Sequence, residues 1–303
     1  MKRYFIILLS AVLLLSGCNS PSQKPDTSDA TATETTQQVI SAGFFTEAEQ
    51  TFYRTESGDL HTGWLELNGT RYYLNDQGVL QTGWLELDGQ TYYLKEDGSV
   101  ARGKTTVDQR VHYFTSAGAK VVMANPWNFI PSDYAPDLVT AEYGYLVDAS
   151  CKDALLEMLS DCRKAGLNPR ITSAYRSHET QIELYNNKVY YYLDLGYSEA
   201  DARKVASTII AVPGTSEHEL GLAVDLVDAN YWVLDEAQEK TAAQKWLMEH
   251  CWEYGFILRY PNNKSDATGI IYEPWHYRYV GKELAKELQG SGLCLEEYFA
   301  ALS

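Results

Sequence analysis

Hydrophobic and polar residues are distributed in three different ways along the chain, and each distribution predicts a different kind of segment. Residues 4–15 form an unbroken apolar run behind Lys2 and Arg3, whereas residues 43–122 carry short aromatic-rich runs at a regular spacing. Residues 149–288 carry longer apolar runs in which helical and strand-like periods are interleaved. Between the first two patterns, residues 19–42 are rich in Ser, Thr, Asp, Pro and Gln, which indicates a flexible linker.

The first apolar run has the proportions of a secretory signal peptide, because it is too short to span a bilayer and follows two positive charges. It ends in Leu15-Ser16-Gly17-Cys18, which resembles a bacterial lipobox. The resemblance implies that residues 1–17 are removed, that Cys18 is lipidated, and that residues 18–42 tether the protein to the extracellular face of the cytoplasmic membrane. The alternative is a plain secretory signal with an incidental cysteine.

Residues 43–122 repeat with a period of 20 residues. The sequence of residues 63–69, Gly-Trp-Leu-Glu-Leu-Asn-Gly, recurs at 83–89, and the Tyr-Tyr-Leu of residues 72–74 recurs at 92–94. Weaker copies on both sides give four units, at 43–62, 63–82, 83–102 and 103–122. Each unit is predicted to form two short strands around a turn, for which Asn-Gly and Asp-Gly are strong signals. Because a lone hairpin is barely stable, we expect stacked hairpins in a β-solenoid, with the outer copies as caps.

The Gly-Trp opening and the Tyr-Tyr pair of these units resemble the cell-wall-binding repeats of choline-binding and glucan-binding proteins. In the choline-binding members, aromatic side chains of neighbouring repeats enclose a quaternary ammonium group through cation–π contacts. The family often has Trp before the Tyr pair, where this chain has Arg71 and Thr91, and the last unit has Lys104 in place of Trp. The alternative is that the aromatic residues form the solenoid core. The residues that match the choline-binding positions are Trp64, Tyr72, Trp84 and Tyr92.

Residues 123–303 are predicted to form one α+β domain. Residues 125–145 hold three prolines and indicate a connector. Ser177 and Ser198 are expected to cap the helices that follow them. The mixed order of elements favours α+β over a doubly wound sheet. We expect helices at 149–165, from 178 onward, and at 198–210, 241–254 and 282–288, and strands at 171–175, 221–227 and 275–280.

The net charge is −16, and it becomes more negative once residues 1–17 are removed, because that segment holds two basic residues and no acidic ones. Such a chain is a poor candidate for binding nucleic acid or anionic lipid. It is also repelled by the phosphates of an anionic wall polymer, so wall binding has to use something other than charge attraction.

Four cysteines follow Cys18, and all of them lie in the C-terminal part. An exported chain permits disulfides. A Cys151–Cys162 pair is disfavoured, because both residues lie on one predicted helix about 16 Å apart along its axis. We therefore expect pairing across elements to Cys251 and Cys294, with four buried free thiols as the alternative. No CxxC occurs, so these cysteines are not expected to bind zinc.

Two short stretches supply the parts of a catalytic zinc site. His218, Asp225 and His276 provide two imidazoles and one carboxylate, and a catalytic zinc with three protein ligands keeps its fourth position for water. His218 and Asp225 are seven residues apart, too far for one helical face, so a loop residue and a strand residue are expected to converge. Glu273 is expected to approach the water without ligating, because Pro274 makes a bend before His276.

The pattern Ser-x-His-x-x-Gly-x-Ala-x-Asp at residues 216–225, followed by Glu-x-Trp-His at 273–276, resembles the VanY/LdcB-like D-alanyl carboxypeptidases. Tyr-Arg-Ser at 175–177 together with Gln181 matches a third motif, and the resemblance covers about residues 125–290. It implies the small α+β domain of Hedgehog-type and D-Ala-D-Ala peptidases. It also implies that His218, Asp225 and His276 bind Zn²⁺. Glu273 is then general base and general acid, Arg176 stabilises the oxyanion or holds the substrate carboxylate, and Gln181 and Ser216 hydrogen-bond that carboxylate.

The resulting hypothesis is a lipid-anchored zinc carboxypeptidase that removes the terminal D-alanine from peptidoglycan stem peptides, with the repeats holding it near a wall polymer. One alternative is an LD-carboxypeptidase that acts on tetrapeptides, with the difference located in the pocket for the penultimate residue and in the insert at 188–210. Another is a wall-binding protein that recognises stem peptides without hydrolysis. An intact Glu273 disfavours the latter, because recognition alone does not need a base.

Overall fold

The computed structural model describes residues 41–302. The expected signal peptide, Cys18 and nearly all of the expected linker lie outside these residues. Within residues 41–302, no helix is both long enough and apolar enough to cross a membrane.

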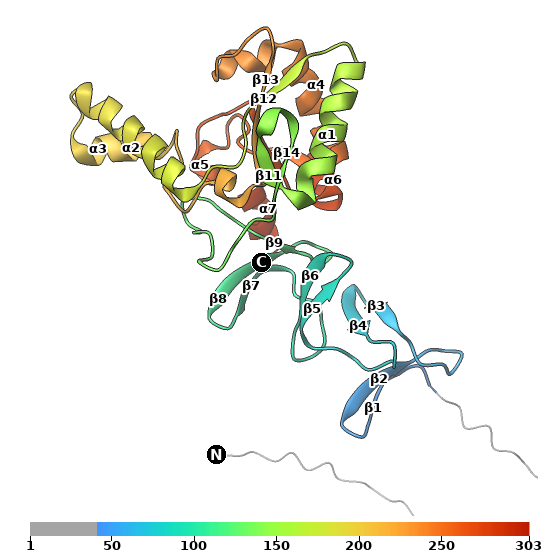
Figure 1. The fold of residues 1–303 in the computed structure, drawn as a ribbon. Helices are drawn as coiled ribbons and strands as arrows, with labels where there is room; N and C mark the ends of the chain where they lie inside the picture. Colours follow the sequence, from blue (N-terminus) through green and yellow to red (C-terminus); the bar gives the residue numbers. More distant parts are fainter. Residues whose placement is uncertain (1–40, 303) are drawn as a thin grey trace, which may run out of the picture. The chain divides into compact units, whose positions relative to one another are not determined.

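The N-terminal part is a series of four β-hairpins, as the period of 20 residues predicts (Figure 1). Each central turn has positive φ at both of its inner residues, namely 50° and 76° at Asn68 and Gly69, and 51° and 72° at Asp88 and Gly89. This is the backbone of a type I′ turn, which matches the twist of the flanking strands. The hairpins are β1 (Gly43–Glu47) with β2 (Gln50–Arg54), β3 (Gly63–Leu67) with β4 (Thr70–Leu74), β5 (Gly83–Leu87) with β6 (Gln90–Leu94), and β7 (Gly103–Val107) with β8 (Arg110–Phe114).

Successive hairpins are joined through their connecting segments. The amide of Leu80 donates to the carbonyl of Thr51 at 2.7 Å, and the amide of Val100 donates to the carbonyl of Arg71 at 2.8 Å. The connecting segments pack so closely that position 118 has to be glycine, because a Cβ there would lie 2.0 Å from a methyl carbon of Val100. Leu74, Leu94 and Phe114, spaced by 20 residues, are fully buried along the array, so stacking supplies the core that one hairpin lacks.

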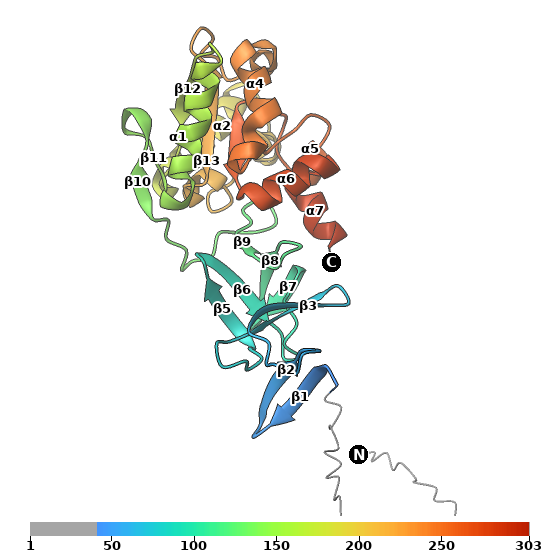
Figure 2. The same ribbon diagram turned by 90° about the vertical axis from the view of Figure 1, so that its right-hand side faces the viewer.

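The C-terminal part is built on a four-stranded antiparallel sheet with the order β12 (Pro169–Ser173), β13 (Ala223–Asp228), β15 (His276–Tyr279), β14 (Phe256–Leu258). Helices α1 (Ala149–Lys164) and α4 (Ala242–His250) cover one face (Figures 1 and 2). Leu155 and Leu159 of α1 pack there with Val224, Leu226 and Tyr277 of the sheet. The sheet and its helices confirm the expected α+β class.

The remaining elements lie outside this sheet, and β9 (Lys120–Val121) pairs with β8 of the last hairpin. Helices α2 (His178–Asp194) and α3 (Glu199–Ala206) pack on each other, and Ser177 and Ser198 cap them as expected. Helix α3 ends four residues earlier than predicted, because Thr208, Ile209 and Ile210 are β-branched and disfavour helix. The other elements are β10 (Leu138–Thr140), β11 (Leu146–Asp148), α5 (Ser265–Thr268), α6 (Lys282–Ser291), α7 (Leu295–Ala301) and the 3₁₀ helices η1 (Glu142–Gly144), η2 (Glu217–Leu220), η3 (Glu236–Lys240) and η4 (Cys251–Tyr254).

Helix α7 was not predicted, and it packs against the last hairpin unit. The ring of Phe299 lies 5.1 Å from that of Tyr113, and the hydroxyl of Tyr298 accepts a hydrogen bond from the amide of Ser116 at 3.0 Å. The hydroxyl of Ser116 donates to Glu287 of α6 at 2.7 Å. The end of the repeat array is therefore held by the C-terminal helices.

The four cysteines of the C-terminal part are free and buried, so the expected disulfide pairing is wrong. Cys151, Cys162 and Cys251 belong to the main hydrophobic cluster, and Cys294 precedes the first residue of α7. These residues serve as small apolar core side chains, a common use of cysteine that sequence spacing cannot distinguish from bridging.

We predict that these thiols are unreactive in the folded protein. Burial raises the pKa of Cys151, Cys162 and Cys251 to about 12 and that of Cys294 to about 11, and only the thiolate attacks thiol reagents. In a Cys18→Ser chain, a chromogenic disulfide reagent should label none of them at neutral pH and all of them in denaturant. Labelling of only two after denaturation without reductant would show that a disulfide exists.

Candidate active site

The register of the sheet brings the predicted site residues together. Asp225 of β13 lies directly opposite His276 of β15 on one side and Ser173 of β12 on the other. Neighbouring residues of a strand point to opposite faces, so the strands bury Val224 and Tyr277 under α1 and α4 and direct Asp225 and His276 to the other face.

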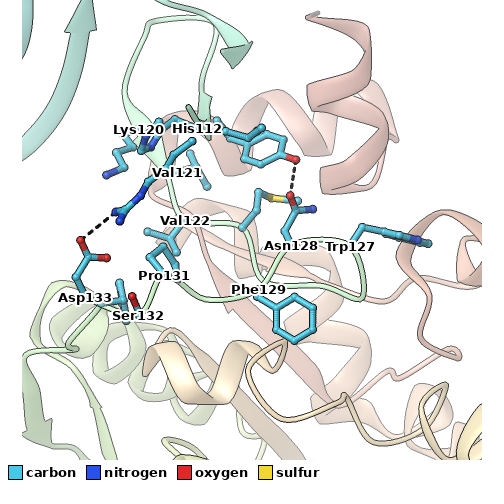
Figure 3. Close-up of a pocket in the computed structure, with 15 residues that line it drawn as sticks. His112, Lys120, Val121, Val122, Trp127, Asn128, Phe129, Pro131, Ser132 and Asp133 are labelled. Atoms are coloured by element: carbon cyan, nitrogen blue, oxygen red, sulfur yellow. Dashed lines mark hydrogen bonds and ion pairs between the residues drawn. The ribbon is translucent and has the colours of Figure 1, made fainter. Parts of the chain in front are cut away.

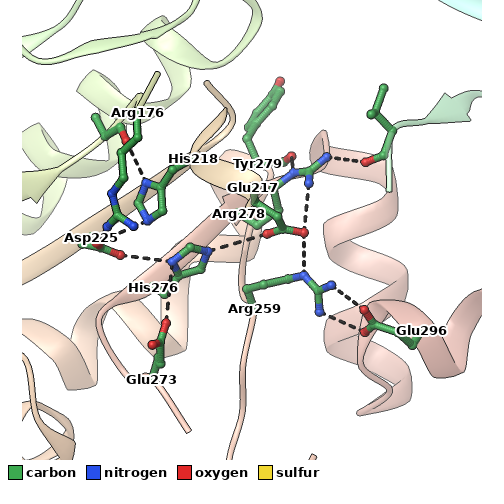
Figure 4. A network of polar contacts seen from close by, with 12 residues as sticks. Arg176, Glu217, His218, Asp225, Arg259, Glu273, His276, Arg278, Tyr279 and Glu296 are labelled. Atoms are coloured by element: carbon green, nitrogen blue, oxygen red, sulfur yellow. Dashed lines mark hydrogen bonds and ion pairs between the residues drawn. The ribbon is translucent and has the colours of Figure 1, made fainter. Parts of the chain in front are cut away.

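His218 reaches the same point from a different element. It lies in η2, and Gly221, directly after this helix, has a φ of 72°, so the chain turns there into β13. Nε2 of His218 is 3.3 Å from Oδ2 of Asp225, and Nδ1 of His276 is 3.1 Å from Oδ1 of the same carboxylate (Figure 4). Within residues 41–302 these three form the one group of His, Cys, Asp or Glu residues placed to hold a metal, with ligand atoms within 4.8 Å of one another.

The chemistry of this donor set fits Zn²⁺. Nδ1 of His218 lies 2.7 Å from the carbonyl oxygen of Ala174, so Nδ1 carries the hydrogen and Nε2 keeps its lone pair toward Asp225. Burial and the charge of Arg176 lower the pKa of His218 to about 4, so this imidazole is neutral at physiological pH. A neutral imidazole oriented by a carbonyl is what a zinc ligand requires.

Glu273 lies beside this group without belonging to it. The amide of His276 donates to the carbonyl of Glu273 at 3.1 Å, which closes the turn expected at Pro274. The Glu273 carboxylate is 3.9 Å from Nδ1 of His276. Burial raises the pKa of Glu273 to about 8, and the charge of Asp225 adds to the increase. A carboxyl group that titrates near neutral pH can both accept and donate a proton during a reaction.

Arg176 follows β12 and points at the same carboxylate. Its Nη2 donates to Oδ2 of Asp225 at 2.8 Å, and its Nε donates to the hydroxyl of Ser173 at 3.0 Å. The side chain is mostly buried and lines the cavity, so its permanent charge is available to a ligand there.

The cavity over the metal-binding group has a volume of about 240 Å³. Ser216 and Trp275 both line it. Three residues at the ends of the insert also line it, namely Lys188 of α2, Ile209 and Ile210.

Gln181 does not line this cavity. Its side chain is fully buried, and its amide nitrogen donates to the carbonyl of Ala211, a lining residue, at 2.7 Å. Tyr260 does line the cavity, with its ring 4.8 Å from that of His276, and no motif marks it in the sequence.

A buried charged network behind the metal-binding group was also missed. Nε of Arg259 is 2.7 Å from Oε1 of Glu217, and Nη1 of Arg278 is 3.0 Å from the same oxygen. Arg259 donates at its other end to both carboxylate oxygens of Glu296 (Figure 4). The sequence offered one hint of this network. Glu217 directly precedes the predicted ligand His218, and Arg278 follows the predicted ligand His276 by two residues.

The four aromatic residues matched to wall-ligand positions do not form one cluster. Trp64 contacts Tyr92 of the next unit, with ring centroids 4.9 Å apart. Tyr72 instead contacts Phe44 at 5.1 Å, and Trp84 contacts His112 at 5.0 Å. The two residues of each pair come from neighbouring units and are separated by the same number of residues in the sequence. The array therefore repeats a single kind of aromatic contact.

A larger cavity, of about 640 Å³, lies between the last hairpin unit and the connector (Figure 3). Tyr113 donates to Asn128 at 2.7 Å along its wall, and Arg110 pairs with Asp133 at 3.3 Å. The metal-binding group is not part of its lining, so size does not identify the reactive site in this protein.

Comparisons with known proteins match two separate parts of the chain. The family model for the VanY D-alanyl-D-alanine carboxypeptidase matches residues 144–282, and a choline-binding repeat model matches residues 61–104. A D-alanyl-D-alanine carboxypeptidase of Enterococcus faecalis is 41% identical over 179 residues, covering 59% of this chain and 65% of that protein. The chain therefore spans just under two thirds of this relative.

Two solved structures are similar to the C-terminal part. The vancomycin resistance D,D-pentapeptidase VanY, solved in complex with Zn(II), is 40% identical with a TM-score of 0.54, covering 58% of this chain and 97% of that chain. The LdcB LD-carboxypeptidase is 32% identical with a TM-score of 0.54, covering 67% of this chain and 95% of that chain. With nearly the whole of both solved domains matched, the chain belongs to the VanY family of D-alanyl-D-alanine carboxypeptidases.

Proposed function

We propose that this protein is a zinc-dependent carboxypeptidase that removes the C-terminal D-alanine from peptidoglycan stem peptides. The observation that carries the proposal is the buried group of His218, Asp225 and His276 at the floor of a cavity, with the carboxylate of Glu273 beside it. The Zn(II) complex of the related D,D-pentapeptidase supports the choice of metal.

In this proposal His218, Asp225 and His276 hold the zinc, which when bound polarises the scissile carbonyl and makes water acidic enough to react near neutral pH. Glu273 accepts the proton of the attacking water and delivers it to the nitrogen of the departing alanine. The raised pKa of Glu273 suits both transfers, since a carboxylate of ordinary pKa is a weaker base toward the water and a group of much higher pKa would not return the proton.

Arg176 and Ser216 are proposed to bind the substrate. The Arg176 guanidinium points into the cavity beside Asp225 and presents a planar, permanently charged donor group. It stabilises either the oxyanion or the terminal carboxylate, and Ser216 donates to that carboxylate. Gln181, one layer behind the lining, is proposed to support this wall through Ala211.

The reaction is tested by giving the metal-loaded protein pentapeptide and tetrapeptide stems separately and analysing the products by mass spectrometry, with a chelator control. Loss of one alanine from the pentapeptide is the expected result. Loss from the tetrapeptide alone would establish the LD reaction, which the similarity to LdcB favours as the second candidate. No chelator-sensitive cleavage of either stem would refute the proposed enzyme and favour a protein that only recognises stem peptides.

The repeats are proposed to hold the enzyme at the cell wall, outside the bacterial cell, through a wall polymer. The choline-binding repeat match over residues 61–104 supports this placement. The lipid anchor at Cys18 is a further proposal, and mass spectrometry of the mature N-terminus tests it.

We predict that zinc uptake depends on pH. Burial lowers the pKa of His276, but its contacts with Asp225 and Glu217 outweigh burial and raise it to about 9. Below that pH the metal-free protein holds a proton that zinc has to displace, so the apparent affinity should fall as pH falls from 9. Calorimetry in buffers of different ionisation enthalpy should detect proton release at pH 7.5, and zinc binding without it would contradict the prediction.

A further inference from the structure

Glu217 is a buried carboxylate for which the proposed reaction has no role. The side chain is completely buried, one residue before His218. Its Oε2 faces Nε2 of His276 at 3.6 Å (Figure 4). Both atoms are buried, and neither has a hydrogen-bond partner in the structure. Buried polar atoms are normally hydrogen-bonded, and these two have only each other within reach. A small shift of the His276 ring would bring them into a hydrogen bond.

Two arginines fix this carboxylate and neutralise its charge. Oε1 of Glu217 lies 2.7 Å from Arg259 and 3.0 Å from Arg278. Guanidinium groups at these distances favour an ionised carboxylate in a buried site. Because Oε1 is committed to the arginines, Oε2 is the oxygen left for His276.

The arginines are themselves anchored in distant parts of the fold. Arg259 donates to Glu296 of α7, and Nη2 of Arg278 donates to the carbonyl of Val122 at 2.8 Å. Arg259 is held in the sheet as well, because its amide donates to the carbonyl of His276 at 3.2 Å. The carboxylate of Glu217 therefore has one position, set by α7, the segment after β9, and strand β15.

We propose that Glu217 is a positioning residue for the metal ligand His276, an inference that rests on the proposed zinc site. Its Oε2 accepts the hydrogen of Nε2, which leaves the lone pair of Nδ1 facing Asp225 and the metal position. The two imidazoles are then oriented differently: His218 by the neutral carbonyl of Ala174, and His276 by a full negative charge. A carboxylate partner also makes the imidazole a stronger donor to a metal.

The test compares Glu217→Gln with Glu219→Gln, a substitution in the same 3₁₀ helix at a residue that pairs with His178 instead. Chelator competition on the purified full chain should show zinc affinity reduced about 10- to 100-fold in Glu217→Gln and unchanged in Glu219→Gln, the size typical of a lost outer-shell partner. Glu217→Asp should recover part of the loss. Equal zinc affinity in Glu217→Gln and wild type would overturn the role of Glu217.

A second measurement needs no variant, in case Glu217→Gln does not fold. Nitrogen-15 NMR of the zinc-loaded wild type should show His276 protonated at Nε2 and metal-bound at Nδ1. A ring bound through Nε2 would overturn the proposal. Failure of the proposed function appears in the wild type as absent zinc binding or absent cleavage, whereas failure of this inference leaves both intact.

A separate observation concerns the repeats. The guanidinium carbon of Arg71 lies 3.8 Å from the ring centroid of Trp64, the aromatic residue paired with Tyr92. Arg71 is tied in place, since its Nη1 donates to the carbonyl of Ala117 at 2.7 Å and its Nε lies 3.6 Å from Glu66. In the next unit, Nζ of Lys120 lies 5.1 Å from the ring centroid of Trp84.

We infer that Arg71 is a built-in occupant of the cation-binding face of Trp64, so this site does not take up choline. A quaternary ammonium would have to displace a guanidinium that already makes the cation–π contact and a hydrogen bond. Arg71 stands directly before the Tyr-Tyr pair, where the family often has Trp. This one residue therefore removes an aromatic side chain of the expected site and also covers the ring of Trp64. The repeats are then stabilised from within, and the wall polymer they contact is recognised by other means.

The test is titration of the full chain with choline chloride by calorimetry, for wild type and Arg71→Trp. Wild type should show no binding at millimolar choline, and Arg71→Trp should gain it, with circular dichroism confirming that the hairpins are intact. Choline binding by wild type would overturn the inference. A folded variant as unresponsive as wild type would overturn it too, because Arg71 would then not be what excludes choline.

Discussion

Glu273→Gln should reduce the turnover of stem peptides by on the order of 10²- to 10⁴-fold while leaving zinc bound. Glutamine has nearly the shape of glutamate but cannot accept the proton of the attacking water. Glu273 is not one of the three residues grouped as ligands, so its replacement should not remove the metal. Turnover measured by mass spectrometry and zinc content measured by elemental analysis of the same sample check the two halves of this expectation.

The matched control for this variant is Glu253→Gln, which changes an exposed glutamate that contacts His250. It should keep wild-type turnover and zinc. Near-normal hydrolysis by Glu273→Gln would refute its role as the base. Loss of zinc together with turnover would instead place Glu273 among the ligands.

His218→Ala should abolish both zinc binding and activity. The imidazole supplies one of three donors, and Asp225 and His276 alone form an incomplete catalytic zinc site. Treatment of wild type with a chelator should have the same effect on activity, but it should be reversed by added Zn²⁺, whereas the variant should not recover. Zinc content and turnover before and after reconstitution are the measurements.

His250→Ala is the control for loss of a histidine as such, since His250 lies at the end of α4 and pairs with Glu253. It should keep full zinc content and activity. A His218→Ala protein that retains one tightly bound zinc and turns over substrate would show that the metal is held elsewhere. Circular dichroism of both variants separates this result from unfolding.

Several features were predictable because their causes are local in the chain. The type I′ turns at Asn68-Gly69 and Asp88-Gly89 follow from two adjacent residues that tolerate positive φ. Ser177 and Ser198 cap helices because a hydroxyl can reach the free amides two or three residues ahead. The grouping of His218, Asp225 and His276 was also predicted, because the motif residues occur at the family's spacing.

The sequence was a poor guide wherever the answer depends on partners far apart in the chain. Free thiols and disulfides require the same residue type, and burial in a shared core, as at Cys151 and Cys162, is decided only by packing. Gln181 belongs to a matched motif, but the position of Ala211, thirty residues further on, turns it toward the main chain and away from the cavity.

By itself, the sequence determined the hairpin repeat, the α+β class and the three residues that converge as a metal-binding group. Only the tertiary structure decided which residues support these features. It places Glu217 opposite His276 and Arg259 against Glu296 of the unpredicted helix α7. It also places Arg71 over the ring of Trp64. The physical reason is that turns, caps and motif spacings act over a few residues. The partner of a buried charge or an aromatic face is set by strand register and by which elements pack together.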